Sequence, residues 1–351
     1  MDRLHSTVPL SFPFAAGVAL AEFAPLPSGS LQVSLFAVSA TLLLLCSGLR
    51  CGRFMAMPCY FFLGVFCACL SSLPGCGASS PGFVRSGLDA TENLIDSIPF
   101  AREGTGALLR ALLTGQRDRL MGETVAAFRR SGASHILALS GMHLGIIYLL
   151  LEKASGLMGR GRKAYALRSI LIILCCWYYA LFTGASPSII RACLFISLNE
   201  VLKHFPQRER NAVNIWSTAL LIQLCITPAA IRSISFQLSY LAMLGIFTLY
   251  PVLDGIYPPG KGPVRKIWSS MAMSISCQAL TAPLVWLRFG TFPKYFLLTN
   301  LLALPITTLL MFCACTTLLL SAIGLCPEIA VRATDFLASL LTGCLEIISR
   351  M

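Results

Sequence analysis

Long runs of apolar residues, separated by short polar loops, make up most of this chain. A helix of about 20 mainly apolar residues is long enough to cross a bilayer. Runs of this kind lie at roughly 9–26, 31–48, 54–73, 134–152, 166–183, 188–203, 212–228, 234–251, 267–287, 294–323 and 328–349. The pattern predicts an all-α polytopic membrane protein with about 11 transmembrane segments, and Pro305 is expected to break the tenth into two segments or to kink it.

The charged residues of the loops follow an alternating pattern along these runs. The loops at 153–168, 203–211 and 254–266 are rich in Lys and Arg, whereas the intervening loops carry almost no charge. Because Lys and Arg accumulate in cytoplasmic loops, the basic loops and the N-terminus are predicted to be cytoplasmic. Residues 74–133 are then extracytoplasmic, and we expect a multi-pass protein of the cytoplasmic (inner) membrane.

Composition agrees with this class and excludes a soluble globular protein. The chain is 56% hydrophobic and 12% charged, with a mean hydropathy of +0.76. The formal net charge of +12 has two explanations, the positive-inside rule and attraction of a polyanion, and both stay open. Most of the 15 cysteines sit inside apolar runs and none form a C-x-x-C pair, so we expect neither a disulfide framework nor a metal site.

The segment at 104–130 combines leucines at near-helical spacing with several arginines. Gly115 and Gly122 interrupt it, which predicts two short helices. These helices are either an amphipathic pair lying in the membrane interface or a basic collar at the mouth of a pore. In the second case, arginines such as Arg117 would gather a polyanion.

Polar residues open the apolar run that begins at residue 134. Ser140 and His143 are three positions apart, and on one continuous helix His135 would lie two turns earlier on the same broad face. Gly141 and Gly145 form a G-x-x-x-G pair, which allows close approach of another helix.

The interpretations of this polar stripe are a hydrogen-bonded contact between helices and the lining of a path. A zinc site would need more ligands, and a Ser–His hydrolase would need an acid and an oxyanion hole that the sequence does not display. We therefore expect no enzyme activity, no cofactor and no bound metal.

Later spans contain further polar residues but almost no carboxylates. Arg191 lies about one turn inside an apolar run, Gln237 lies near the start of another, and Asn300 precedes Pro305. Arg191 either extends to the membrane surface as an anchor or faces protein, water or an anion in the interior. A path lined by neutral donors, histidine and arginine suits an anionic passenger better than a cation.

Five short motifs together resemble the ComEC family of competence-type DNA-uptake channels. They are LLTGQRDRL (112–120), SHILALSGMHLG (134–145), SPSIIRA (186–192), SFQLSYLAMLGI (235–246) and NLLALP (300–305). The resemblance implies inward passage of single-stranded DNA across the inner membrane during natural transformation. It places Arg117, His135, Ser140, Gly141, His143, Arg191, Gln237 and Asn300 in the channel lining or along the DNA path.

The chain departs from larger members of that family. Segment 76–104 is too short for an OB-type domain, and no H-x-H-x-D-H cluster of a metallo-β-lactamase-like domain follows the channel. The predicted division is 1–75 for N-terminal membrane segments, 76–104 for a short extracytoplasmic loop and 105–351 for the competence-type channel domain.

Several partners and alternative functions follow from these interpretations. The expected partners are single-stranded DNA, membrane lipid, a separate cytoplasmic motor and periplasmic DNA-delivery proteins. The chain carries no phosphate-binding loop of the G-x-x-x-x-G-K-[ST] type that would mark a motor of its own. The alternatives are a transporter for another anionic solute, an intramembrane enzyme using Ser140 and His143, and a structural subunit of an uptake machine without a pore.

Overall fold

The computed structural model describes most of the chain, and helices joined by turns and loops make up the part that it describes. The described residues are 7–23, 38, 41, 53–71, 82–102, 104–156, 161–205, 211–260, 262–290, 294–325 and 327–351. No strand occurs within them, which confirms the all-α prediction for these residues. The predicted span at 31–48 lies almost wholly outside the described residues.

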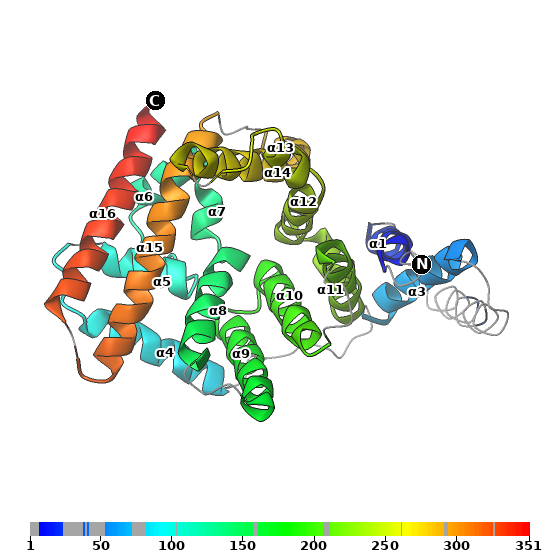
Figure 1. Cartoon of the computed structure of the whole chain (residues 1–351), viewed down its shortest axis with the longest axis horizontal. Helices are drawn as coiled ribbons and strands as arrows, with labels where there is room; N and C mark the ends of the chain where they lie inside the picture. Colours follow the sequence, from blue (N-terminus) through cyan, green and yellow to red (C-terminus); the bar gives the residue numbers. More distant parts are fainter. Residues whose placement is uncertain are drawn as a thin grey trace. The chain divides into compact units, whose positions relative to one another are not determined.

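The chain divides into two compact units, and each is formed by two stretches of sequence (Figure 1). The first unit contains Met1–Ser79 and Leu194–Phe247, and the second contains Ser80–Cys193 and Thr248–Met351. The first unit therefore takes residues 194–247 in addition to the predicted N-terminal membrane segments. Helix α10 (Pro187–Lys203) runs from the second unit into the first.

The first unit is built on a close crossing of two helices, α1 (Val8–Phe23) and α3 (Arg53–Ser71). Gly17 of α1 lies against the backbone of Phe61, and Gly64 of α3 lies against the backbone of Phe14. Glycine at both positions allows this approach, because a side chain at either would overlap the other helix. The unit is completed by α11 (Ala212–Ile226), the 3₁₀ helix η3 (Pro228–Arg232) and α12 (Ile234–Thr248).

The second unit contains most of the predicted functional residues. Its helices are α4 (Gly82–Ser97), α5 (Thr105–Leu113), α6 (Gly122–Arg130), α7 (Ser134–Leu137), α8 (Gly141–Ser155), α9 (Arg162–Phe182), the start of α10, α13 (Tyr250–Gly255), α14 (Pro263–Phe289), α15 (Phe296–Ala322) and α16 (Glu328–Arg350). Helices α15 and α16 run side by side (Figure 1). Their inner faces form a core with α5, in which Leu112, Leu310 and Leu341 are fully buried.

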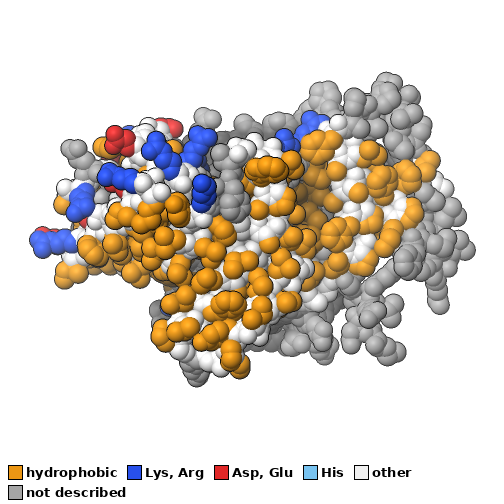
Figure 2. Space-filling view, turned by 90° about the horizontal axis from the view of Figure 1, so that it is seen from above, with side chains coloured by type: hydrophobic (Ala, Val, Ile, Leu, Met, Phe, Trp, Pro, Cys, Tyr) orange, Lys and Arg blue, Asp and Glu red, His pale blue; other side chains and the backbone are white. Residues whose placement is uncertain are grey.

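Several helices have the length and composition of membrane spans. Four are long and apolar enough to cross a bilayer: Lys163–Phe182, Ile234–Gly255, Pro263–Phe289 and Phe296–Ala322. Shorter apolar helices lie at Val8–Phe23, Met57–Ala68 and Ala212–Ile226. Hydrophobic side chains cover much of the face seen in Figure 2, and Lys and Arg gather toward one end of that view. The chain is a multi-pass membrane protein, and the count of about 11 spans stays a prediction.

Pro305 does not interrupt the tenth predicted span. Helix α15 continues through it from Phe296 to Ala322, so the predicted division into two segments is wrong, and the alternative of a kink at Pro305 stays a prediction. A proline removes one N–H donor from a helix, but the surrounding turns keep their own bonds, and membrane helices tolerate such a loss.

The two short helices predicted at 104–130 are α5 and α6, and Gly115, with φ +83°, lies in the turn after α5. Their placement differs from the interfacial pair considered above, because seven of the nine residues of α5 are buried. Helix α5 is a core element of the second unit. Its leucines pack inward, while α6 buries only Ala127 and Phe128.

Substituting Gly115 with alanine should destabilise the protein more than the same change at Gly104. Both glycines have positive φ, +83° and +97°, and both would be strained by a side chain. A Cβ at position 115 would also lie 2.5 Å from Leu139 Cδ1, whereas nothing lies within 4 Å of one at 104. We expect a loss of roughly 2 kcal/mol at 115 and about 1 kcal/mol at 104. Unfolding in detergent measures both, and equal losses would contradict the predicted contact with Leu139.

Candidate functional site

The apolar run that carries the two histidines is a broken helix. Helix α7 ends at Leu137, and α8 begins at Gly141. Between them the backbone is extended, with φ −75° and ψ 126° at Ala138 and φ −129° and ψ 169° at Ser140. His135 and His143 therefore lie on different helices, and the prediction of one continuous polar stripe is wrong.

Ser140 and His143 form the start of α8. The Ser140 Oγ accepts a hydrogen bond from the Met142 N–H at 3.3 Å, and the His143 Nδ1 accepts one from the Ser140 N–H at 3.2 Å. This reciprocal arrangement is a capping box, in which the third residue of the helix is usually Glu or Gln. It satisfies donors that would otherwise be unpaired at a helix end inside apolar surroundings.

The capping box fixes the state of the His143 ring. Because Nδ1 accepts from the backbone, the neutral ring carries its hydrogen on Nε2. The side chain is fully buried, and Nε2 has no hydrogen-bond partner within the described part of the chain. Protonation at Nδ1 would break the cap, so the geometry favours a bracing role over a cationic one. The described residues also contain no group of three His, Cys, Asp or Glu side chains placed to hold a metal.

His135 and Arg117 lie at the other end of the break. His135 is exposed, and its Nδ1 is 3.1 Å from the carbonyl oxygen of Gly132. Arg117 is also exposed, and its Nη2 donates to the carbonyl oxygen of Leu137 at 2.9 Å. A cation at the last carbonyl of α7 stabilises the point where the helix stops. Arg117 is thus attached to the broken helix, with the rest of its guanidinium accessible.

Gly141 and Arg191 bring α8 and α10 together. A Cβ at position 141 would lie 3.4 Å from the Ala192 Cβ and 3.5 Å from Arg191 Nη2. At Gly145, nothing lies within 4 Å of that point in the described structure. The predicted close approach therefore applies to Gly141 and not to Gly145.

The turn before α10 has an unusual backbone. Gly184 and Ala185 both have positive φ, +78° and +51°, and Ser186 Oγ is buried without a hydrogen-bond partner among the described residues. Arg191 follows one turn into α10 and is 9% exposed. This burial favours an interior position for its guanidinium over that of a membrane-surface anchor.

Gln237 and Asn300 have different surroundings. Gln237 belongs to the first unit. Its Nε2 donates a hydrogen bond to the carbonyl oxygen of Ile231, near the end of η3, at 2.7 Å. Asn300 belongs to the second unit and lies in α15, where its Oδ1 is buried with no partner in the described residues. Its neighbour Thr299 donates to the carbonyl oxygen of Ser131 at 2.6 Å, which attaches α15 to the turn before α7.

Sequence reasoning missed a buried ion pair in α5. Arg110 is 3% exposed, and its Nη1 lies 3.1 Å from Glu92 Oε2 on α4, while its Nη2 pairs with Asp96. The hydrogen bond from Arg110 lowers the pKa of Asp96 below its usual value. An arginine inside the run ALLRALL was a signal of this pairing, although its partners are distant in sequence.

Two further residues were missed. Tyr179 of α9 donates to the carbonyl oxygen of Leu113 at 2.9 Å, which ties α9 to the end of α5. Asp335 of α16 is buried and accepts a hydrogen bond from the Ala101 N–H at 2.7 Å. It is a buried carboxylate in a region where the sequence suggested almost none.

Replacing His143 with glutamine should preserve the helix cap, whereas leucine should remove it. Glutamine keeps an acceptor for the Ser140 N–H, and it is a usual residue at this position of a capping box. With leucine, the partly buried Ser140 N–H loses its partner, which costs about 1–2 kcal/mol. Unfolding of the purified variants in detergent measures the difference. If the glutamine variant were as unstable as the leucine variant, the cap would not be what His143 supplies.

The described geometry defines a class of protein before any comparison. It is a helical multi-pass membrane protein whose second unit contains a capped, broken helix packed against a buried arginine. The chain belongs to the Competence protein family, which matches residues 112–351 and so covers more than half of it. The family resemblance drawn from the short motifs is thereby confirmed.

Two curated relatives are similar to this chain over more than half of its length. ComE operon protein 3 of Bacillus subtilis (strain 168) is 27% identical over 206 residues, which are 59% of this chain and 25% of that protein. Uncharacterized protein YcaI of Escherichia coli (strain K12) is 28% identical over 212 residues, 58% of this chain and 27% of that protein. The chain thus spans about a quarter of the length of these relatives. No solved structure matches the chain significantly.

Proposed function

We propose that this chain forms an inner-membrane path through which single-stranded DNA enters the cell during natural transformation. Membership of the Competence protein family supports a role in DNA uptake. The observation that carries the more specific proposal is a set of buried polar atoms without partners on helices of the second unit. The expected path runs between these helices.

The unpartnered atoms belong to three helices that pack on one another through α15. They are His143 Nε2 on α8, Gln278 Nε2 on α14, and Asn300 Oδ1 and Thr307 Oγ1 on α15, and none has a hydrogen-bond partner in the described structure. Each such atom costs about 1–3 kcal/mol when it stays unsatisfied. Unpartnered polar atoms on apolar helices are typical of a functional interior. In an open state of the path, water or the transported molecule would hydrogen-bond to these atoms.

The charges of the second unit favour an anionic passenger. Arg191 is buried beside Gly141, and the unpartnered atoms on α8, α14 and α15 belong to neutral imidazole, amide and hydroxyl groups. A DNA backbone needs cationic or dipolar guidance and little recognition of its bases. Arg117, Arg129 and Arg130 are exposed and would gather the strand before it enters. A motor and delivery proteins would be separate partners.

DNA uptake by living cells tests the proposal directly. Fluorescent double-stranded DNA is offered to a strain lacking this chain and to the same strain carrying it, and entry into the cytoplasm is scored by nuclease protection. We expect protection only in the complemented strain, and only for one strand of the duplex. Equal protection in both strains would overturn the proposal. Restored uptake of a small anion, without restored DNA uptake, would favour the solute transporter instead.

Cysteine labelling should show on which side of the membrane each predicted segment lies. An engineered cysteine at Met121, which is exposed in the segment predicted to be extracytoplasmic, should react with an impermeant maleimide added to intact cells. One at Lys163, which is exposed near the start of α9 in the basic segment predicted to be cytoplasmic, should react only after the cells are opened. The background variant carries serine in place of all 15 native cysteines, because Cys76 lies in the same predicted extracytoplasmic segment as Met121. The reverse pattern would contradict the inward direction of transport.

A further inference from the structure

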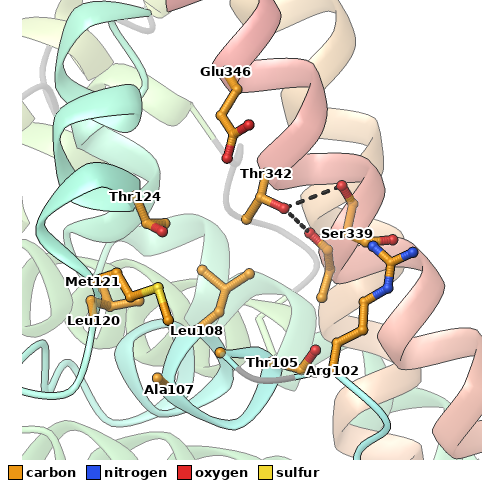
Figure 3. A pocket seen from close by; sticks show the side chains of 12 residues that line it. Arg102, Thr105, Ala107, Leu108, Leu120, Met121, Thr124, Ser339, Thr342 and Glu346 are labelled. Carbon is orange, nitrogen blue, oxygen red and sulfur yellow. Dashed lines mark hydrogen bonds between the residues drawn. The ribbon is translucent and has the colours of Figure 1, made fainter.

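A polar cavity lies between α5, α6 and α16, apart from the broken helix and Arg191. Its volume is about 220 Å³, and polar side chains from all three regions line it (Figure 3). These side chains are Arg102, Thr105, Thr124, Ser339, Thr342 and Glu346. None of them takes part in the proposed DNA path.

One end of the cavity is suited to an anion. Helix α5 begins there at Thr105 with Gly104 as its N-cap, and α6 begins after Met121, so neither helix has a side-chain cap. Helix N-termini carry unpaired N–H groups and a partial positive charge that favour phosphate. Arg102 lies at the same end and adds a full positive charge.

Thr105 provides independent support for a ligand at this end. The residue is 5% exposed, and its hydroxyl makes no hydrogen bond within the described residues although it lines the cavity. Because this hydroxyl lines the cavity and is not occupied by a bond within the described residues, it can donate to or accept from a group that enters the cavity. The bond from the Ala101 N–H to Asp335 holds the adjoining segment against α16, which places Arg102 at the cavity wall.

The other end of the cavity carries a negative charge. Glu346 projects from α16 into the space in Figure 3, with Thr342 between it and Arg102. A strand of phosphates would be repelled by this carboxylate. A ligand that carries a phosphate and, a few atoms away, an ammonium group would satisfy both ends.

The size of the cavity and its surroundings narrow the ligand further. A volume of about 220 Å³ is below the roughly 300–1,000 Å³ of sites that enclose drug-sized molecules, so it suits a small head group better than a nucleotide. Phe336, Leu340 and Ile347 are 64%, 42% and 63% exposed on α16. Their spacing places them on a helix face adjacent to Ser339, Thr342 and Glu346. An apolar surface beside a polar cavity suits an amphiphile.

We propose that this cavity binds the zwitterionic phosphoethanolamine head group of a membrane lipid. The phosphate accepts hydrogen bonds from Arg102, Thr105 and the N-terminus of α5, and the ammonium group donates to Glu346. The acyl chains lie along the apolar face formed by Phe336, Leu340 and Ile347. Binding of this lipid would fix α5 and α6 to α16 whether or not the chain conducts DNA.

Native mass spectrometry of the full chain released from detergent tests the proposal with two lipids of matched acyl chains. Phosphatidylethanolamine carries both charges, and phosphatidylglycerol carries the phosphate alone. We expect the wild type to retain phosphatidylethanolamine preferentially. Arg102→Gln should lower retention of both lipids about tenfold, because a charge-assisted contact to phosphate is lost. Glu346→Gln should lower phosphatidylethanolamine retention alone and so remove the preference.

Arg332→Gln and Glu328→Gln are the matched controls, because this exposed pair lies on the same helix and does not line the cavity. Both should retain lipid as the wild type does. Unchanged lipid preference in Glu346→Gln, or equal losses in the controls, would overturn the proposal. Displacement of the lipid by a single-stranded oligonucleotide would also overturn it and would assign the cavity to DNA. Thr105→Val provides a variant without a charge change and should weaken retention of both lipids.

Discussion

Replacing Arg110 with methionine should lower the free energy of unfolding by about 3 kcal/mol. The guanidinium is 3% exposed and contacts the Glu92 carboxylate at 3.1 Å and the Glu92 carbonyl oxygen at 3.2 Å. Methionine fills similar space but leaves Glu92, whose side chain is 18% exposed, without its counter-ion. An uncompensated charge in a core of leucines is the source of the loss. Unfolding in detergent, followed by helical circular dichroism, measures it.

A double variant separates the ion pair from the packing of the arginine stem. Arg110→Met together with Glu92→Leu removes both charges, so it should be more stable than the sum of the single losses predicts. Arg129→Met is the matched control, because Arg129 is exposed on α6, and it should change stability little. Strict additivity of the two core substitutions would show that the charges of Arg110 and Glu92 do not interact.

Acid should weaken the same cluster through Asp96. Arg110 holds the pKa of Asp96 below its usual value, so the folded state binds this proton less readily than the unfolded state. The stabilisation is fully present above the unfolded pKa of about 3.9 and is lost as pH falls through the folded value. The wild type should therefore lose more stability than Asp96→Asn on acidification below about pH 4. Parallel losses in the two proteins would contradict this role of Asp96.

The positions of the long helices follow from the sequence because a bilayer imposes length and hydropathy on each span. The runs at 267–287 and 294–323 correspond to α14, Pro263–Phe289, and α15, Phe296–Ala322. Such runs are local properties, and tertiary contacts do not need to be known. The effect of Pro305 was overestimated, because one missing donor does not end a helix that apolar surroundings stabilise on both sides.

The break between α7 and α8 was harder to predict. The residues ILAL and LGII form one nearly continuous apolar pattern, which favours a single helix over 134–152. The spacing of Ser140 and His143 did contain the signal, because it is the spacing of a capping box. Histidine at the third position obscured it, since Glu and Gln are the usual residues there.

Long-range partners account for the rest of what the sequence could not supply. Arg110 was visible among leucines, but nothing in its own segment identifies Glu92 and Asp96 on α4. The bond between Asp335 and Ala101 joins residues 234 positions apart. Hydropathy places helices within a membrane, whereas the contacts that orient α5 against α4 and α16 depend on side chains from distant segments.

Replacing Arg191 with glutamine should abolish DNA uptake while leaving the amount of protein in the membrane near normal. Arg191 belongs to the second unit, and the residue is only 9% exposed, which is too low for a membrane-surface anchor. If positive charge alone guides the backbone, Arg191→Lys should retain partial uptake. If a planar, two-pronged contact with phosphate is needed, the lysine variant should be inactive. Uptake at the wild-type level by Arg191→Gln would remove Arg191 from the proposed path.

Gly141 should be needed for DNA uptake, because the absence of a side chain there leaves room for the guanidinium of Arg191. The contacts of a Cβ at position 141, 3.4 Å to Ala192 and 3.5 Å to Arg191 Nη2, are ordinary, so Gly141→Ala should retain uptake and stability. Leucine reaches further and must displace the guanidinium, at a cost of roughly 1–3 kcal/mol. We expect Gly141→Leu to reduce uptake more than His143→Asn does, since asparagine keeps an acceptor near the Ser140 N–H.

The coupling between these two positions can be measured without transport. In an Arg191→Ala background the guanidinium is absent, so Gly141→Leu should cost less stability than it does in the wild type. Ala192→Gly, which removes the other contact at position 141, should relieve less of the cost because only a methyl group is removed. Equal costs of Gly141→Leu in the wild-type and Arg191→Ala backgrounds would mean that Gly141 is needed for the local structure of α8 and not for the contact with Arg191. The close approach of α8 and α10 would then not depend on the arginine.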